Sequence, residues 1–244
     1  MSEKKIITLE QEEMARATMG LGPPTPELLL DVPKGEVRPI FYWPDPVLGV
    51  PCADVPAFDE ALKKLVSDLA LTMYTVGGVG LSAPQIGIPL RVFVVDRLAS
   101  EEPKAGRPAS QLLVAVNPKL WVIDEAQIER PEGCLSFPGV YESIPRPSRV
   151  AVKAFNHRGE PWAMALSHDL SQAVQHEYDH VEGVTMLEHM DGPASFRTRM
   201  AMEALHKRLG KTPPTKPELK AEPSVSKGDR KAARKARKKA RRRR

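Results

Sequence analysis

His176-Glu177-Tyr178-Asp179-His180 places two imidazoles four residues apart, with a carboxylate directly after the first. On a helix these two side chains lie on one face, a turn apart, within reach of one metal ion. The pattern is the H-E-x-x-H arrangement of metal-dependent hydrolases. Because a pattern this short also arises by chance on an exposed helix, the flanking sequence has to decide between the two interpretations.

The flanking residues predict that this pattern lies on one helix of about four turns. Ser167 can cap the helix, and Asp169 places a negative charge in its first turn, where the helix dipole favours it. Gly183 supplies a C-terminal stop. Apolar residues recur between these ends at helical spacing: Leu170, Ala173, Val174 and Val181. Since such a stripe has to pack into a core, we expect both histidines to lie inside the domain.

The sequence around the pentapeptide lacks a third metal ligand. Metzincins extend the pattern to H-E-x-x-H-x-x-G-x-x-H, and here Gly183 matches the glycine while Met186 stands at the last histidine. Glu182 is too close along the helix, and Glu188 and His189 are interpreted as surface residues. The third ligand is therefore expected from elsewhere in the chain.

Cys134 is the best candidate for that ligand. It lies in the stretch EGCLS at 132–136, and the chain has only one other cysteine, Cys52. An intracellular chain with so few thiols more often uses one for metal binding or catalysis than for a disulfide. A thiolate and two imidazoles leave the fourth position of a tetrahedral site for water. Cys52 is expected to be an ordinary buried residue.

A glycine-rich stretch, GGVGLSAPQIG at 77–87, is the third pattern. It follows a run that predicts an amphipathic helix after Asp59, with apolar residues at helical spacing: Leu62, Leu65, Val66, Leu69, Met73 and Val76. The glycines end that helix and allow the backbone to approach a ligand closely. The stretch is not a dinucleotide-binding fingerprint, because it follows a helix and precedes a predicted strand at 91–95. Gln85 adds a neutral amide donor.

In this order, the three patterns resemble those of the peptide deformylase family, and the resemblance extends from about Val37 to about Gly210. They are GVGLSAPQ at 78–85, EGCLS at 132–136 and QHEYDH at 175–180. The resemblance implies an α+β fold in which antiparallel β-sheets wrap a central helix that carries the histidine pair. It also implies removal of the formyl group from N-formylmethionine at the start of nascent polypeptides.

The resemblance further implies roles for individual catalytic residues. Glu177 would be the acid/base group, while the Gln85 side chain and the Leu135 backbone N–H would stabilise the oxyanion. The metal would be held by Cys134, His176 and His180.

Substrate contacts are expected from Val79, Gly80 and Gly133, and the walls of an apolar methionine pocket from Val79, Leu135 and Ala173. Tyr141 stands where many relatives have an arginine near the peptide-binding cleft, so the substrate-backbone contact made there by relatives is not carried over.

The expected cofactor is one divalent metal ion. The residues alone leave iron, zinc and nickel open, and the resemblance implies Fe²⁺ in the cell, with activity lost on oxidation. Such an ion lowers the pKa of a bound water to about 7, and Glu177 can take that proton and return it to the leaving amine. The developing oxyanion requires preorganised donors. The reaction is amide hydrolysis.

Length and composition predict one catalytic domain at 37–210, after an N-terminal extension at 1–36. The chain has 244 residues, of which 41% are hydrophobic. No apolar run approaches the roughly 18 residues that a membrane helix needs. Acidic residues among 1–14 do not fit a signal or transit peptide. We therefore expect a cytoplasmic, monomeric enzyme without membrane contact.

The C-terminal segments carry the positive charge of the chain. Residues 211–226 include four prolines and predict an extended linker. Residues 227–244 hold twelve Lys or Arg and one Asp, a net charge of +11, so the other 226 residues carry −6 within a whole-chain charge of +5. This tail is either a disordered, solubilising end or an anchor to the ribosome or ribosomal RNA. The contrast with an acidic body favours the anchor.

Coarser patterns predict the remaining elements. Strands are expected at 91–96, 112–117 and 150–155, with a polar loop at 100–111. A final helix is expected at 194–209, with Met200, Ala204 and Leu205 on one side, and a short helix around 9–19.

Two other functions compete with a deformylase. Another H-E-x-x-H hydrolase, such as a peptidase, would act on a peptide whether or not it is formylated. An RNA-binding protein with a lapsed hydrolase body would release no formate, and the presence of Glu177 and all three candidate ligands argues against it. Metal analysis with a formate-release assay separates the three.

Overall fold

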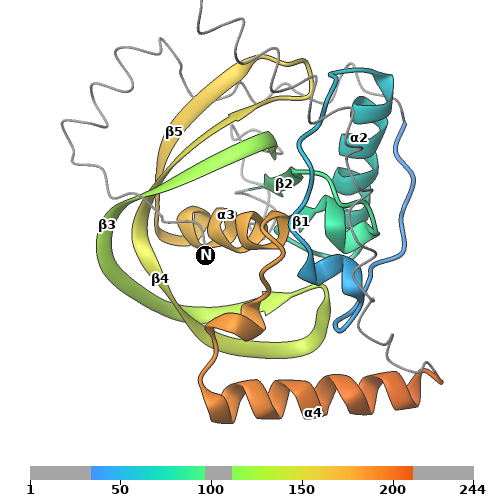
Figure 1. The fold of residues 1–244 in the computed structure, drawn as a ribbon, viewed down its shortest axis with the longest axis vertical. Coiled ribbons are helices and arrows are strands. Elements are labelled where there is room, and N and C mark those ends of the chain that lie inside the picture. Colours follow the sequence, from blue (N-terminus) through green and yellow to red (C-terminus); the bar gives the residue numbers. More distant parts are fainter. Residues whose placement is uncertain (1–33, 97–111, 211–244) are drawn as a thin grey trace, which may run out of the picture. The chain divides into compact units, whose positions relative to one another are not determined.

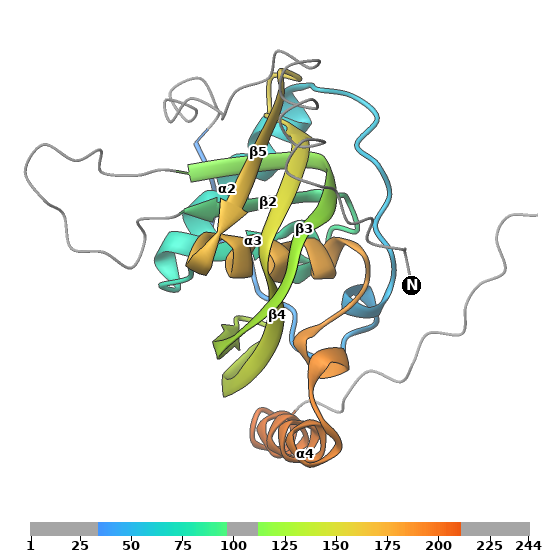
Figure 2. The same ribbon diagram turned by 90° about the vertical axis from the view of Figure 1, so that its left-hand side faces the viewer.

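The computed structural model describes residues 34–96 and 112–210, and the strands in these residues form one five-stranded sheet. Each strand pairs antiparallel with the next along the chain. The strands are β1 (Gly80–Ser82), β2 (Val92–Asp96), β3 (Leu112–Cys134), β4 (Phe137–Phe155) and β5 (Pro161–Ser167). β3 and β4 bend into a deep curve (Figures 1 and 2). The predicted α+β class is confirmed.

The central helix α3 (His168–Val181) lies in the hollow of this curve and packs against all five strands (Figure 1). Val174 and Val181 are buried in the core, and three neighbours on the helix pack against the same cluster: Leu170, Ala173 and Tyr178. The prediction that the histidine pair lies on a core helix is confirmed.

The two ends of α3 differ in how well they match the predictions. Ser167 is the N-cap residue, but its side chain makes no hydrogen bond to the helix N–H groups, because its Oγ lies 2.9 Å from Nδ1 of His168. Asp169 lies in the first turn as predicted. Gly183 follows the helix with a φ of 72°, a left-handed conformation that favours glycine, so the predicted stop is confirmed.

β3 and β4 are much longer than the sequence patterns predict. Only 112–117 and 150–155 are predicted as strands, whereas the hairpin has arms of 23 and 19 residues. Prolines obscure the strand pattern in both arms: Pro118, Pro131, Pro138, Pro145 and Pro147. Such prolines are tolerated where pairing is irregular, and the register between these two strands shifts at four places.

α2 (Glu60–Thr75) is the predicted amphipathic helix, and it packs on β1 and β2. Asp59 caps it by accepting a hydrogen bond of 3.0 Å from the N–H of Leu62. Five members of the predicted apolar stripe are buried: Leu62, Leu65, Val66, Leu69 and Met73. The sixth, Val76, is 44% exposed because it follows the last turn of the helix.

α4 (Gly192–Arg208) is the predicted final helix and lies at the bottom of Figure 1. Of the side expected at Met200, Ala204 and Leu205, only Leu205 packs against the core, since Met200 is 49% exposed and Ala204 is exposed. The buried residues are instead Ala194, Thr198, Met202 and His206. Apolar residues occur on more than one side of α4, so helical spacing alone does not identify the buried one.

Three short 3₁₀ helices complete the described elements: η1 (Pro46–Gly49), η2 (Ala83–Ile86) and η3 (Met186–His189). No helix in the described ranges is long and apolar enough to cross a membrane. The predicted helix around 9–19, the loop at 100–111, the linker at 211–226 and the basic tail at 227–244 lie outside the described residues.

Candidate metal centre and catalytic pocket

Cys134, His176 and His180 come together as the sequence predicts. One ligand atom of each lies within 4.8 Å of the others, and Sγ of Cys134 is 3.3 Å from Nε2 of His180. Cys134 is the last residue of β3, while both histidines lie on α3. One thiolate and two imidazoles, with exposed fractions of 8%, 6% and 0%, are a donor set that suits a borderline divalent ion such as zinc or iron. The cluster therefore fits a divalent metal.

Glu132 orients the first histidine ligand. Its Oε1 accepts a hydrogen bond of 2.6 Å from Nδ1 of His176, which leaves Nε2 of the ring for the metal. Arg146 holds the carboxylate from the other side with bonds of 3.0 Å from Nε and 2.6 Å from Nη2. Gln172 adds a bond of 3.2 Å from its side-chain amide. The ring of His176 is thus held in one orientation by a buried carboxylate.

The same guanidinium group ties the hairpin to α3. Arg146 on β4 is 1% exposed and also pairs with Asp179, the residue before the second histidine ligand. Asp179 accepts a further hydrogen bond of 2.7 Å from Nε2 of His189 in η3. The interpretation of His189 as a plain surface residue is therefore wrong.

These supporting residues were not identified from the sequence. Glu132 and Asp179 lie inside the EGCLS and HEYDH patterns, so carboxylates beside ligands were a usable signal. Arg146 had no such signal, because its partners are 14 and 33 residues away along the chain.

The electrostatics of the cluster follow from burial and close charges. Burial lowers the pKa of His180 well below its ordinary value, and the positive charge of His176 acts in the same direction. Burial opposes protonation of His176 as well, but the negative charge of Cys134 and the hydrogen bonds to Cys134 and Glu132 outweigh it and raise the pKa of that ring. The anionic groups that raise the pKa of His176 are also the ones that would stabilise a cation held there.

Glu177 is placed as an acid/base group requires. It is 4% exposed and lines the pocket, and Oε2 has no hydrogen-bond partner among the described residues. Burial raises its pKa to about 7, although the positive charge of His176 opposes this. A carboxyl group with a pKa near neutrality can both accept and return a proton. Gly80 lies against it, since a β-carbon on residue 80 would come within 2.5 Å of Oε1.

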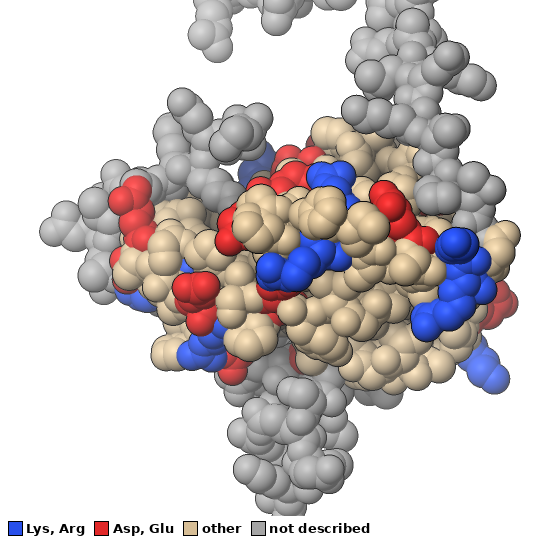
Figure 3. Space-filling model, turned by 90° about the horizontal axis from the view of Figure 1, so that it is seen from below, with Lys and Arg blue, Asp and Glu red and all other residues tan. Residues whose placement is uncertain are grey.

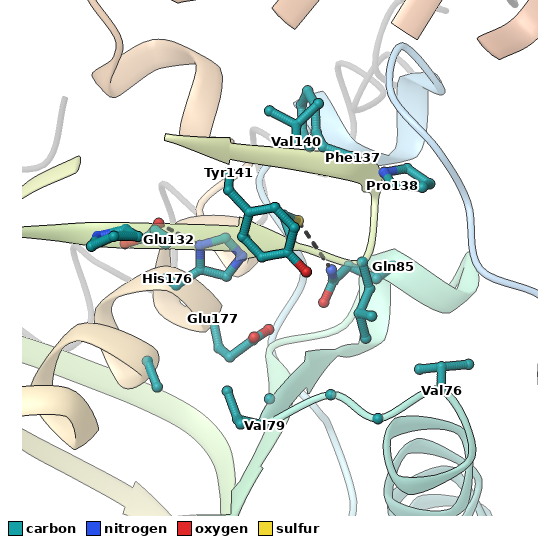
Figure 4. A pocket seen from close by; sticks show the side chains of 18 of the residues that line it. Val76, Val79, Gln85, Glu132, Phe137, Pro138, Val140, Tyr141, His176 and Glu177 are labelled. Atoms are coloured by element: carbon teal, nitrogen blue, oxygen red, sulfur yellow. Dashed lines mark hydrogen bonds and ion pairs between the residues drawn. The ribbon is translucent and has the colours of Figure 1, made fainter. Parts of the chain in front are cut away.

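The side-chain amide of Gln85 is held in a fixed orientation at the same site. Oε1 accepts hydrogen bonds of 2.9 Å from both the backbone N–H and the hydroxyl of Ser82. This turns the amide nitrogen toward Cys134 and Ser136, at 3.5 and 3.3 Å. Gln85 therefore presents an N–H donor beside the ligand cluster (Figure 4).

A cavity of about 670 Å³ opens onto these groups. Glu177, Gln85 and His176 all lie along it (Figure 4). It brings together every residue predicted to contact substrate or to form a methionine pocket: Val79, Gly80, Gly133, Leu135 and Ala173. Leu135 lies in the turn between Cys134 and Phe137.

Cys52 lies apart from the pocket, as predicted. It is 8% exposed and belongs to the apolar cluster around Val174 and Val181. Burial raises the pKa of its thiol to about 11.

Known proteins are similar to this chain in sequence and in fold. The protein-family model of polypeptide deformylase matches residues 37–195. A peptide deformylase of Aquifex aeolicus is 39% identical over 173 residues, which cover 71% of this chain and 97% of that protein. The chloroplastic/mitochondrial peptide deformylase 1B of Arabidopsis thaliana is 37% identical over 169 residues, which cover 69% of this chain and 60% of that protein. The crystal structure of a Legionella pneumophila peptide deformylase is 33% identical with a TM-score of 0.64, and the match covers 73% of this chain and 100% of that one.

Proposed function

Because the chain belongs to the peptide deformylase family, we propose that its pocket acts with Fe²⁺ as the metal and Glu177 as the acid/base group. The chain is a hydrolase that removes the formyl group from the N-terminal formylmethionine of polypeptides and releases formate. One observation supports these roles. Glu177 is buried, lines the cavity and lies next to the cluster of Cys134, His176 and His180.

Each residue then has a defined task. Cys134, His176 and His180 would hold the metal, which when bound supplies a hydroxide nucleophile at neutral pH. Glu177 takes the proton from the attacking water and delivers it to the leaving amine. The amide nitrogen of Gln85 donates to the oxygen of the formyl group as negative charge develops there. The backbone N–H of Leu135 is proposed as the second donor.

The walls of the cavity explain a preference for methionine. Val79, Leu135 and Ala173 line it, and we assign them to the methionine side chain. Gly80 and Gly133 also line the cavity, and we assign them to contacts with the substrate backbone. A formyl group is the smallest acyl group, so a site closed around it excludes larger ones.

The test compares one peptide in two forms. Purified protein with its metal content measured is given an N-formylmethionyl tripeptide and the same tripeptide without the formyl group. We expect stoichiometric formate from the first and no cleavage of the second. Cleavage of peptide bonds in both would identify a peptidase, and a metal-loaded protein that releases no formate would remove the deformylase assignment.

The partners and compartment are also proposed. We place the enzyme in the cytoplasm as a monomer, working on nascent chains while residues 227–244 contact ribosomal RNA phosphates. We assign this contact to the tail and not to the face that carries α4. On that face Lys and Arg are interspersed with Asp and Glu and do not form a uniform basic patch (Figure 3). The organellar name of the Arabidopsis relative makes fractionation of cells the direct check on the compartment.

A further inference from the structure

Tyr141 both lines the catalytic cavity and is exposed to solvent. Its side chain is 75% exposed, more than any other large apolar residue in the described ranges. Its neighbour Val140 is only 9% exposed, so the strand itself is packed and only the tyrosine ring stands out from it. Covering an exposed aromatic ring with a ligand is favourable, because it removes apolar surface from water.

The ring is held in place by the strand opposite. Tyr141 on β4 pairs in register with Gly133 on β3. A β-carbon on residue 133 would lie 2.6 Å from Cε1 and 2.9 Å from Cδ1 of the tyrosine, so the ring rests directly on the glycine backbone. An aromatic side chain that covers a cross-strand glycine is a known way of stabilising such a pair. Here it also fixes the direction in which the ring points.

That direction is into the cavity. Gly133 directly precedes Cys134, and Figure 4 shows the tyrosine ring reaching from β4 across the pocket that Gln85, His176 and Glu177 line. A substrate with its formyl group at Glu177 and its methionine side chain against Val79 has to continue out of the cavity. The exposed ring of Tyr141 is the large apolar surface that the rest of the peptide can cover.

We propose that Tyr141 is a specificity-determining residue that binds the substrate beyond the formylmethionine and favours an apolar or aromatic side chain there. The inference rests on the proposed function, since it takes the reacting group to lie at Glu177. The ring face supplies the contact through burial and stacking, and the hydroxyl is not required.

The experiment measures selectivity at the residue after methionine. kcat/KM for formate release is determined with formyl-Met-Phe-Gly and formyl-Met-Gly-Gly, and their ratio is compared among variants. The parent should favour the phenylalanine peptide by roughly 10-fold, the scale expected for covering one aromatic side chain. Tyr141→Phe should keep this ratio. Tyr141→Ala should lose most of it, chiefly through KM, because the contact exists before the chemical step.

A matched control and a second readout make the result decisive. Phe196→Ala removes another exposed aromatic residue, 65% exposed on α4 and outside the cavity lining, and should keep the parent ratio. Dissociation constants of both peptides, measured on a Glu177→Ala background where they are not consumed, should show the same difference. The inference is overturned if Tyr141→Ala keeps the parent ratio, even with lowered thermal stability, or if Phe196→Ala loses it equally. A parent protein that turns over neither formylated peptide would instead overturn the proposed function.

Discussion

The α-carbon of Gly80 lies so close to the Glu177 carboxylate that a β-carbon on residue 80 would be 2.5 Å from Oε1. Gly80→Ala should therefore displace the carboxylate while leaving the metal ligands in place. A displacement on the order of 1 Å costs about 100-fold in rate. We expect kcat to fall by about that factor with unchanged metal content. Gly49→Ala, where a β-carbon meets nothing within 4 Å, is the control and should match the parent.

Replacing Cys134 tests the ligand set. Cys134→Ser exchanges a thiolate for a hydroxyl group, which binds a borderline or soft ion more weakly. The purified variant should contain less metal, and activity should fall with it. Elemental analysis and formate release on the same sample provide the check. Full metal content together with full rate would show that Cys134 is not a ligand.

Replacing Glu177 separates catalysis from metal binding. Glu177→Ala should bind metal nearly as well as the parent but lose formate release by several orders of magnitude, because the three motifs position no other acid/base group for the task. His176→Ala should lose both metal and activity. A Glu177→Ala protein that works within a few-fold of the parent would refute the role given to this carboxylate.

Removing Arg146 should destabilise the fold as well as the site. Arg146→Met leaves Glu132 and Asp179 as buried carboxylates without their common cation. Breaking a buried ion pair in this way costs about 3–5 kcal/mol of unfolding free energy. Arg197→Met is the control, because its pair with Glu142 is 3.2 Å long and 63% exposed on the arginine side, and it should cost less than about 1 kcal/mol. Urea unfolding of both variants measures the difference.

Deleting the basic tail should separate activity from ribosome contact. A chain that ends at Gly210 should keep its activity on short formylated peptides. It should lose most of its co-sedimentation with ribosomes, and with it the steep decrease in binding as salt is raised. Equal ribosome binding with and without residues 227–244, at low and moderate salt, would reject the anchor and favour contact through α4.

Local patterns in the sequence were sufficient for the helices that build the site. Helical spacing identified α2 and α3, because the same residues that recur along the chain also face the core. Cys134 was joined to the histidine pair by the small number of thiols and by the order of the three motifs, since nothing local indicates that β3 ends beside α3.

Features that depend on pairing across the fold were not predictable in this way. The long arms of β3 and β4 rest on hydrogen bonds between strands, and prolines such as Pro131 and Pro145 hide them. Arg146 reaches Glu132 and Asp179 only after the hairpin has closed over α3. The buried side of α4 is likewise decided by its neighbours, because His206 bonds to the carbonyl oxygen of Trp43 at 2.6 Å.

Cys134 ends β3, whereas its partner ligand His180 lies 46 residues later on α3. A metal bound by both residues would therefore cross-link the hairpin to the central helix. A ligand that binds only the folded state adds about 4 kcal/mol to its stability when its free concentration exceeds the dissociation constant 1,000-fold. The stability of the contact between the hairpin and the central helix then depends in part on the free concentration of the metal ion. Chelation of the ion would thus lower both the activity of the protein and its lifetime in the cell, because both depend on the bound ion.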